Sequence, residues 1–190
     1  MKLRREGDRT RCEASLSKTL AELQLDYIDL YLIHWPFAFE ETVLEKPAGS
    51  PQPLRLPDGS PNPIWTIKME YLATWRALES FHRDGRCRSI GVSNFTTEQL
   101  EHLLGVCEIP PSVNQVEVHP YLQQAPLVDF CTGKGIAVMG YSPLGSSFDR
   151  PPPAVHGVPL LNHPVVLAAA ERHGRTPAQV LLRWGLQRYP

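Results

Sequence analysis

The sequence predicts an α/β fold in which short parallel strands alternate with helices. Apolar runs typical of strands that are covered on both faces lie at residues 27–33, 89–93, 113–118 and 136–141. After the first run the strands recur every 20–25 residues, with helical patterns between them. This repetition requires right-handed parallel crossovers, and both a Rossmann sheet and a TIM barrel fit it.

The helical segments are predicted from apolar residues three and four positions apart and from capping signals. Residues 12–24 place leucines on one stripe. Thr96 with Gln99 forms a capping box, and so does Thr176 with Gln179. The other helices are expected at 67–84, at 124–133, and between an Asn162 cap and a Gly174 stop. A helix is therefore expected between each consecutive pair of strands.

Residues 37–66 interrupt this alternation. Six prolines in the segment exclude a long helix or a central strand, and Asp58-Gly59 marks a turn or a short hairpin between residues 54 and 63. Loops of this length are usually functional or disordered. Because periodic structure resumes directly afterwards, we interpret the segment as a lid-like loop within a single domain that covers residues 1–190.

Composition and charge exclude several classes of protein. The chain is 42% hydrophobic and 21% charged with a net charge of −1, so it has no electrostatic field that would attract nucleic acid or an anionic membrane. No apolar stretch is long enough to span a membrane or to serve as a signal peptide. Scattered cysteines without a CxxC pair argue against a metal site and fit a reducing compartment. We therefore expect a soluble cytoplasmic protein; its cysteines are Cys12, Cys87, Cys107 and Cys131.

Two common nucleotide-binding motifs are missing from the strand ends. No strand is followed by GxGxxG, so the Rossmann fingerprint is absent. The run from Gly140 to Gly145 lacks the Lys-Ser/Thr pair of a phosphate-binding P-loop. Any nucleotide cofactor would have to be bound in another way.

Polar and aromatic residues stand where the predicted strands end. His34 and Trp35 follow the first strand, and a hydroxyl and an amide, Ser93 and Asn94, end the second. Gln115 lies in the third strand; Tyr141 and Ser142 end the fourth. In a β/α barrel these ends share one mouth, which is where active sites form. Each residue taken alone also fits a structural role, such as a satisfied core histidine or a strand amide that pairs with backbone groups.

Taken together, the sequence segments that surround these residues resemble the aldo-keto reductases, nearest the aldehyde and aldose reductase branch. The matching segments, which occur in the family's order, are "LQLDYIDLYLIHWP", "RSIGVSNFTTEQLEHLL", "VNQVEVHPYLQQ", "YSPLGS" and "LLNHPVVLAAAERHGRTPAQVLLRW". The resemblance implies a (β/α)8 barrel that binds NADPH or NADP⁺ without a Rossmann fold and reduces aldehydes and ketones. It also implies a small carbonyl substrate and, for a completed barrel, a monomer.

The resemblance assigns roles residue by residue. His34 matches the active-site histidine that orients the substrate carbonyl, and Trp35 matches a wall of the substrate pocket. A second group matches the cofactor contacts: carboxamide ligands, the ring under the nicotinamide, the loop over the pyrophosphate, and an acidic residue that closes this loop. These positions are Ser93, Asn94, Gln115, Tyr141, Ser142, Leu144, Ser146 and Asp149. Residues 37–66 match the family's first substrate loop.

The match departs from the family at both ends of the chain. The family's general-acid tyrosine and its aspartate come from segments upstream of residue 1, and Lys2 matches the lysine that assists them. An exposed terminal lysine is the other interpretation of Lys2. The family's last strand and its 2′-phosphate cluster follow the last matched residues. We therefore expect a partial (β/α)8 TIM barrel of about four parallel strands with unpaired sheet edges, and marginal stability.

Three functions remain open from the sequence. The first is an NADPH-dependent oxidoreductase, acting here as a fragment without the general-acid tyrosine. The second is a non-catalytic NADP-binding module or an inactive truncated fragment. The third, an unrelated β/α-barrel enzyme acting on phosphorylated substrates, would need a glycine-rich phosphate loop that the sequence does not show.

Overall fold

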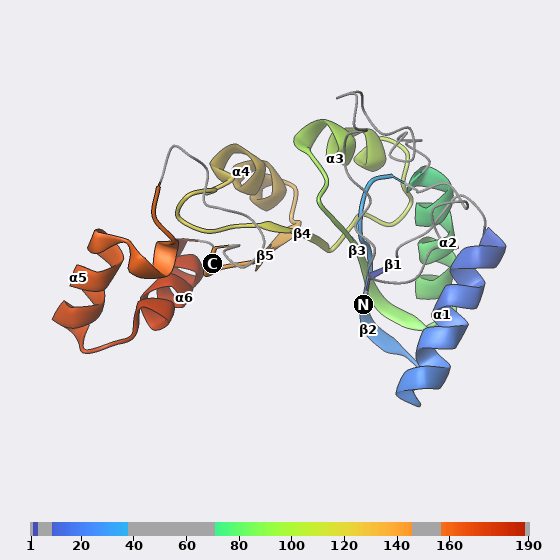
Figure 1. The fold of residues 1–190 in the computed structure, drawn as a ribbon. Helices are drawn as coiled ribbons and strands as arrows, with labels where there is room; N and C mark the ends of the chain where they lie inside the picture. Colours follow the sequence, from blue (N-terminus) through green and yellow to red (C-terminus); the bar gives the residue numbers. More distant parts are fainter. Residues whose placement is uncertain (1, 4–8, 38–70, 146–156, 189–190) are drawn as a thin grey trace, which may run out of the picture. The chain divides into compact units, whose positions relative to one another are not determined.

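A computed structural model describes residues 2–3, 9–37, 71–145 and 157–188 of the chain (Figure 1). The chain divides into two compact units, Met1–Ser112 and Val113–Pro190, which we describe separately. The first unit contains β1 (Lys2–Leu3), α1 (Arg9–Leu23), β2 (Ile28–Ile33), α2 (Tyr71–Arg83), β3 (Cys87–Ser93) and α3 (Thr97–Leu104). The second contains β4 (Val113–Glu117), α4 (Ala125–Gly133), β5 (Ala137–Tyr141), the 3-10 turn η3 (Leu160–Asn162), α5 (Pro164–His173) and α6 (Pro177–Arg188). The predicted α/β class with parallel strands and flanking helices is confirmed.

The first unit is built on a parallel sheet in the order β1-β2-β3. Lys2 aligns with Leu32 at one edge, and the β2–β3 ladder runs in register from the Ile28–Cys87 pair to the Ile33–Val92 pair. The carboxyl-terminal halves of β2 and β3 are fully buried, as the apolar runs predicted. Helix α2 contacts both strands and α1. The large side chains of this core include Leu16, Tyr31, Trp75, Leu78, Phe81 and Leu100.

A buried carboxylate connects α2 to the chain that leads out of α3. Glu79 is only 3% exposed, and its Oε1 accepts hydrogen bonds from the backbone N–H groups of Glu108 (2.7 Å) and Ile109 (2.9 Å). One turn earlier, Trp75 Nε1 donates to the Ile109 carbonyl at 3.1 Å. The segment after α3 therefore has its backbone groups satisfied by side chains of α2, because no ladder is available to it there.

An arginine organises the turn between α2 and β3. Gly85, at φ +83°, adopts the left-handed conformation that ends α2. Arg86 then donates to both carboxylate oxygens of Asp84, with a shortest distance of 2.6 Å, and pairs with Glu13 of α1. Its guanidinium also lies 4.8 Å from the centre of the Phe81 ring. The charge network thus closes the end of the core where β3 begins.

The second unit has a two-stranded parallel ladder, β4–β5, and a separate helical cluster. No residue of β5 is buried, and Met139 is 41% exposed. Leu160, Val166 and Leu181 form a buried cluster that joins η3, α5 and α6. The strand predicted at residues 136–141 exists as β5, but its faces are much less covered than those of β2 and β3.

The helix ends follow the predicted signals with one correction. Both capping boxes form, at Thr96 with Gln99 and at Thr176 with Gln179. Asn162 does not cap α5; it lies in η3, and His163 Nδ1 accepts from the backbone N–H of Val165 instead. The reason is that η3 uses Asn162 as a helical residue, which leaves the next residue as the non-helical one in front of the helix. The hairpin expected at 54–63 lies outside the described residues.

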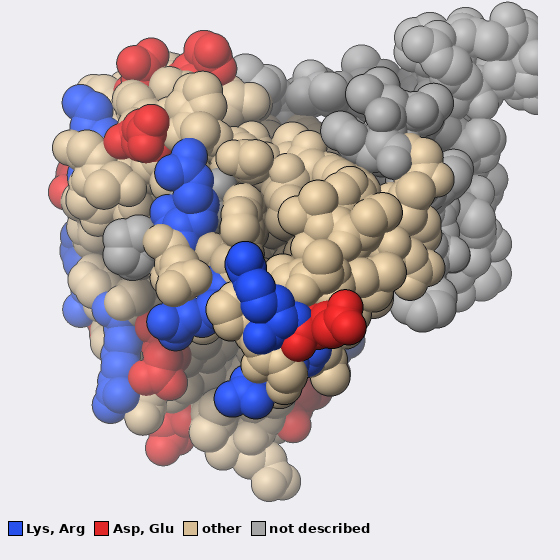
Figure 2. Space-filling view, turned by 90° about the vertical axis from the view of Figure 1, so that its left-hand side faces the viewer, with Lys and Arg blue, Asp and Glu red and all other residues tan. Residues whose placement is uncertain are grey.

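No helix in the described ranges is both long enough and apolar enough to cross a bilayer. Basic and acidic side chains are interspersed over the face drawn in Figure 2. This distribution agrees with the net charge of −1.

Glu79 holds the Glu108 and Ile109 N–H groups through two hydrogen bonds, which we call the Glu79 clamp. Replacement of Glu79 should therefore cause a local loss of stability. Glu79→Ala should cost about 2–3 kcal/mol of unfolding free energy, because it leaves two partly buried N–H donors without their acceptor. Urea titration measures this loss, and hydrogen exchange should accelerate at the Glu108 and Ile109 amides. Glu101→Ala, at an exposed position of α3, should change stability by less than about 0.5 kcal/mol. Unchanged exchange at the two amides in Glu79→Ala would contradict the clamp.

The Arg86 network predicts acid sensitivity. Hydrogen bonds from Arg86 lower the pKa of Glu13 from its ordinary value of 4.5 and that of Asp84 from 3.8. Because the folded-state pKa values are depressed, this stabilisation is present above about pH 4.5 and is lost as the pH falls through the lowered values. Both carboxylates are 43% exposed, so we expect only about 0.5–1 kcal/mol per pair.

The test of this network compares urea unfolding at pH 6 and pH 3. The wild-type protein should lose about 1 kcal/mol more on acidification than Arg86→Gln does. Arg88→Gln is the control, since Arg88 forms an exposed pair with Asp29 at 3.0 Å. An equal acid loss in the wild type and in Arg86→Gln would show that the network is not the sensitive element.

Candidate active site

The imidazole of His34 stands directly after the last residue of β2. It is half-buried and stacks on Trp35, with ring centroids 5.8 Å apart and an interplanar angle of 25°. Trp35 in turn stacks on Phe37 at 5.5 Å and is 38% exposed. The strand end therefore presents an imidazole beside a partly exposed indole ring; the role of the two groups in carbonyl binding stays a prediction.

The amide of Asn94 follows the end of β3 and reaches the end of β2. Its Nδ2 lies 2.9 Å from the backbone carbonyl oxygen of His34 and 3.2 Å from Ser93 Oγ. Asn94 has a φ of +63°, in the left-handed region that few non-glycine residues adopt. Ser93 is fully buried. The structure thus brings together three of the predicted site residues, His34, Ser93 and Asn94.

Lys2 is found in β1, beside β2. Its Cα aligns with Leu32, two residues before His34. Lys2 and Leu3 thus form a short strand, and it pairs with the strand that leads to the histidine. The role of Lys2 stays a prediction.

The second unit carries the other predicted cofactor residues. Gln115 aligns with Met139 across the β4–β5 ladder, and its Nε2 lies 2.7 Å from the Met139 sulfur. Tyr141 aligns with Glu117 at the end of the same ladder. Gln115 and Tyr141 therefore occupy neighbouring strands of one ladder, two residues apart in register.

A tight turn follows β5. Ser142 has a φ of +51°, and the Gly145 N–H donates to its carbonyl at 2.9 Å. Gly145 is at φ +83°, and a Cβ placed there would come within 3.1 Å of Leu160 Cδ1. Leu144 packs against the buried cluster around Leu160. The backbone after β5 is thus held in a fixed turn. Ser146, Asp149 and nearly all of the predicted substrate loop at 37–66 lie outside the described residues.

A pair of ionisable groups near the end of β4 adds to the polar residues of the second unit. His119 Nε2 lies 3.0 Å from Glu117 Oε1, and His119 is 8% exposed. Tyr121 packs edge-on against His119 and donates from its hydroxyl to the Val158 carbonyl. These contacts hold the His119 ring between Glu117 and Tyr121. In the described ranges no group of three or more His, Cys, Asp or Glu side chains could hold a metal ion.

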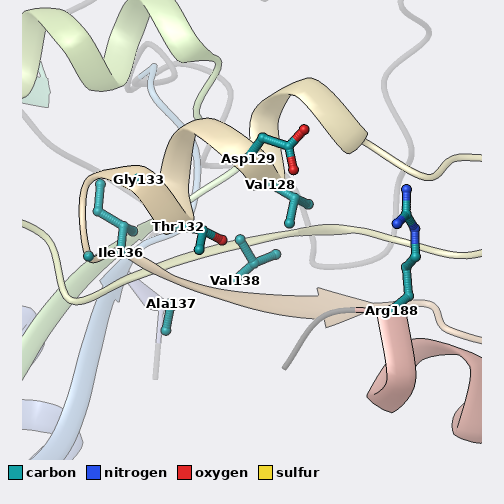
Figure 3. A pocket seen from close by; sticks show the side chains of 9 residues that line it. Val128, Asp129, Thr132, Gly133, Ile136, Ala137, Val138 and Arg188 are labelled. Carbon is teal, nitrogen blue, oxygen red and sulfur yellow. The ribbon is translucent and has the colours of Figure 1, made fainter.

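The second unit also has a groove with a volume of about 670 Å³ (Figure 3). Its walls come from α4, from the start of β5 and from the end of α6; they include Asp129, Thr132, Val138 and Arg188. None of the predicted site residues lines this groove. The groove is therefore separate from the candidate site.

Sequence reasoning missed the link between the two strand ends in the first unit. Asn94 was predicted as a cofactor ligand, and its bond to the His34 carbonyl was not foreseen. A signal for it exists in the sequence. Asn is one of the few residues that adopt the left-handed conformation readily, and here it stands between a strand and a helix that Thr96 already caps.

Comparisons with known proteins identify a family for this chain. The profile of the aldo/keto reductase family matches residues 1–190. Aldo-keto reductase family 1 member A1 of Cricetulus griseus is 48% identical over 176 residues, and the protein of the same name in Homo sapiens is 47% identical. Each match covers 93% of this chain and 51% of the relative, so the chain spans about half the length of the curated relatives it matches.

Solved structures show the same relationship. A Bombyx mori aldo-keto reductase in complex with NADP matches 98% of this chain and 54% of its own, with a TM-score of 0.73 and 36% identity. A second aldo-keto reductase, complexed with NADPH, matches 99% of this chain and 51% of its own, with a TM-score of 0.75 and 33% identity. The chain belongs to the aldo/keto reductase family.

Proposed function

We propose that this chain carries the carbonyl-binding and nicotinamide-binding part of an NADPH-dependent reductase of aldehydes and ketones. The observation that carries the proposal is the shared edge of β2 and β3. There the His34 imidazole stacks on Trp35, and the Asn94 amide bonds the His34 backbone. The family and its NADP-bound members support the choice of cofactor.

His34 would act on the substrate oxygen. Reduction of a carbonyl builds negative charge on oxygen, and an imidazole N–H placed beside that oxygen stabilises the charge. The exposed Trp35 ring beside His34 would form an apolar wall that orients the carbonyl compound. His34 follows directly after β2, whose last three residues are buried, so a fixed strand leads into the imidazole.

The donor and acceptor set fits a nicotinamide. When bound, the reduced nicotinamide supplies the hydride. Amide side chains of Asn94 and Gln115 are chemically matched to its carboxamide, and Ser93 would support the Asn94 amide through their 3.2 Å contact. Tyr141 offers a flat ring for the pyridine face. We propose that Ser142, Leu144, Ser146 and Asp149 form the loop beside the pyrophosphate.

We further propose that Lys2 takes part in proton transfer, and that the protein is cytoplasmic, with a small carbonyl substrate and no nucleic-acid or membrane partner. The completed barrel would act as a monomer.

A non-catalytic NADP-binding module is the second candidate. In that case the cofactor contacts proposed above would bind NADPH without turnover.

Substitution of the histidine tests the proposal. His34→Gln should lower NADPH-dependent reduction of an aromatic aldehyde by roughly 100-fold, because the stabilising donor is lost from the developing oxyanion. NADPH binding, measured by fluorescence quenching, should stay within about twofold, since His34 contacts the substrate and not the cofactor. His173→Gln, at an exposed position of α5, is the matched control and should leave both values unchanged.

The possible outcomes separate the candidates. Turnover that survives in His34→Gln would remove His34 from the mechanism. Binding of NADPH by the wild-type chain without turnover would favour the binding module. Absence of both binding and turnover in the wild-type chain would refute the proposed function for the isolated chain.

A further inference from the structure

The ladder between β2 and β3 stops one residue short of the candidate site. Its last aligned pair is Ile33 with Val92, so His34 lies just beyond the regular pairing. At this point the Asn94 side chain turns back and donates from Nδ2 to the His34 carbonyl oxygen at 2.9 Å. A side-chain amide thus continues the connection between the strands where the backbone ladder ends.

The turn that presents this amide is fixed on both sides. Ser93 is 0% exposed and Phe95 is 1% exposed. Phe95 packs against the Tyr71 ring, edge to face, with centroids 5.0 Å apart. Thr96 then caps α3 in a complete capping box. Two buried neighbours and a capped helix therefore hold Asn94 at φ +63°.

That backbone conformation is uncommon for a residue with a Cβ, although asparagine adopts it more readily than most residues do. Here the buried Ser93 and Phe95 on either side fix the turn that contains it. The Nδ2 group also lies 3.2 Å from Ser93 Oγ, so two polar contacts orient the same amide nitrogen. The backbone conformation, the packing of the neighbouring residues and the hydrogen bonds together constrain the Asn94 amide.

The consequence falls on the histidine. Asn94 restrains the His34 backbone, and stacking on Trp35 at 5.8 Å restrains its ring. The imidazole position then depends on both restraints. A misplacement of about 1 Å can cost on the order of 100-fold in rate. Loss of the restraint on the His34 backbone should therefore lower the rate of the reaction.

We propose that Asn94 is a positioning residue for His34, in addition to its proposed contact with the cofactor carboxamide. The catalytic part of this inference rests on the proposed function, but the positioning itself is a property of the chain without ligand. Asn is suited to both demands, since its amide donates to a carbonyl and its backbone tolerates the left-handed region.

Two variants test the amide donor separately from the left-handed backbone. Asn94→Asp keeps the shape and the backbone preference but replaces the donor with a carboxylate that only accepts. Asn94→Gly keeps the backbone freedom and removes the side chain. Both should move the His34 Cε1–Hε1 cross-peak in a ¹H–¹³C spectrum by more than a linewidth. The peak is assigned by its disappearance in His34→Gln.

The matched control is Gln24→Gly. Gln24 is also left-handed, at φ +56°, but it is exposed and follows α1. It should leave the His34 peak in place. With saturating NADPH, kcat of Asn94→Asp and Asn94→Gly should fall by about 10-fold to 100-fold while the control stays near wild type.

A direct measurement covers the case in which the variants do not fold. In the wild-type chain, scalar coupling across the hydrogen bond between Asn94 Nδ2 and the His34 carbonyl carbon should be detectable. Absence of that coupling, or an unmoved His34 peak in both folded variants, would overturn the proposal. Absence of turnover in the wild type would refute the proposed function alone, because the coupling and the His34 peak are read without cofactor.

Discussion

Parallel pairing of β2 with β3 decides where the chemistry of the first unit can lie. In a parallel ladder the carboxyl ends of both strands meet at one edge, so residues that follow them in sequence become neighbours in space. His34 and Asn94 are 60 residues apart in the chain, yet their polar atoms lie 2.9 Å apart. The apolar residues that bury these strands therefore also assemble the polar groups, and loss of register by one residue would separate them.

Polar clamps secure the same sheet away from the site. Arg86, with its two carboxylate partners, fixes the chain just before β3 begins, and Glu79 satisfies the backbone of the segment after α3. Both clamps involve α2 or its end, and α2 also provides the Trp75 and Phe81 rings of the core. One helix thus joins apolar packing to hydrogen bonding, which places β3 and the Asn94 turn in a defined position.

Much of this arrangement was predictable because it depends on local signals. The strands, the capping boxes and the residues at the strand ends follow from periodicity and from residue type. The Asn162 cap was wrong, although Pro164 in the first helical position indicated His163 as the cap. Glu79 could not be recognised from the sequence, since a glutamate in an amphipathic helix is usually exposed. Its burial depends on backbone donors of residues 108 and 109, which are close only in the folded chain.

The two units differ in how well they bury the strands that carry the predicted residues. Around His34 and Asn94 the strands are buried on both faces, and the turn is over-determined. Around Gln115 and Tyr141 the outer strand β5 has no buried residue, so its hydrogen bonds to β4 are more open to water. Local opening is easier where few apolar contacts protect the backbone. The arrangement of His34 and Asn94 is therefore intrinsic to the first unit, whereas the positions of Gln115 and Tyr141 depend on a strand that its own unit stabilises only weakly.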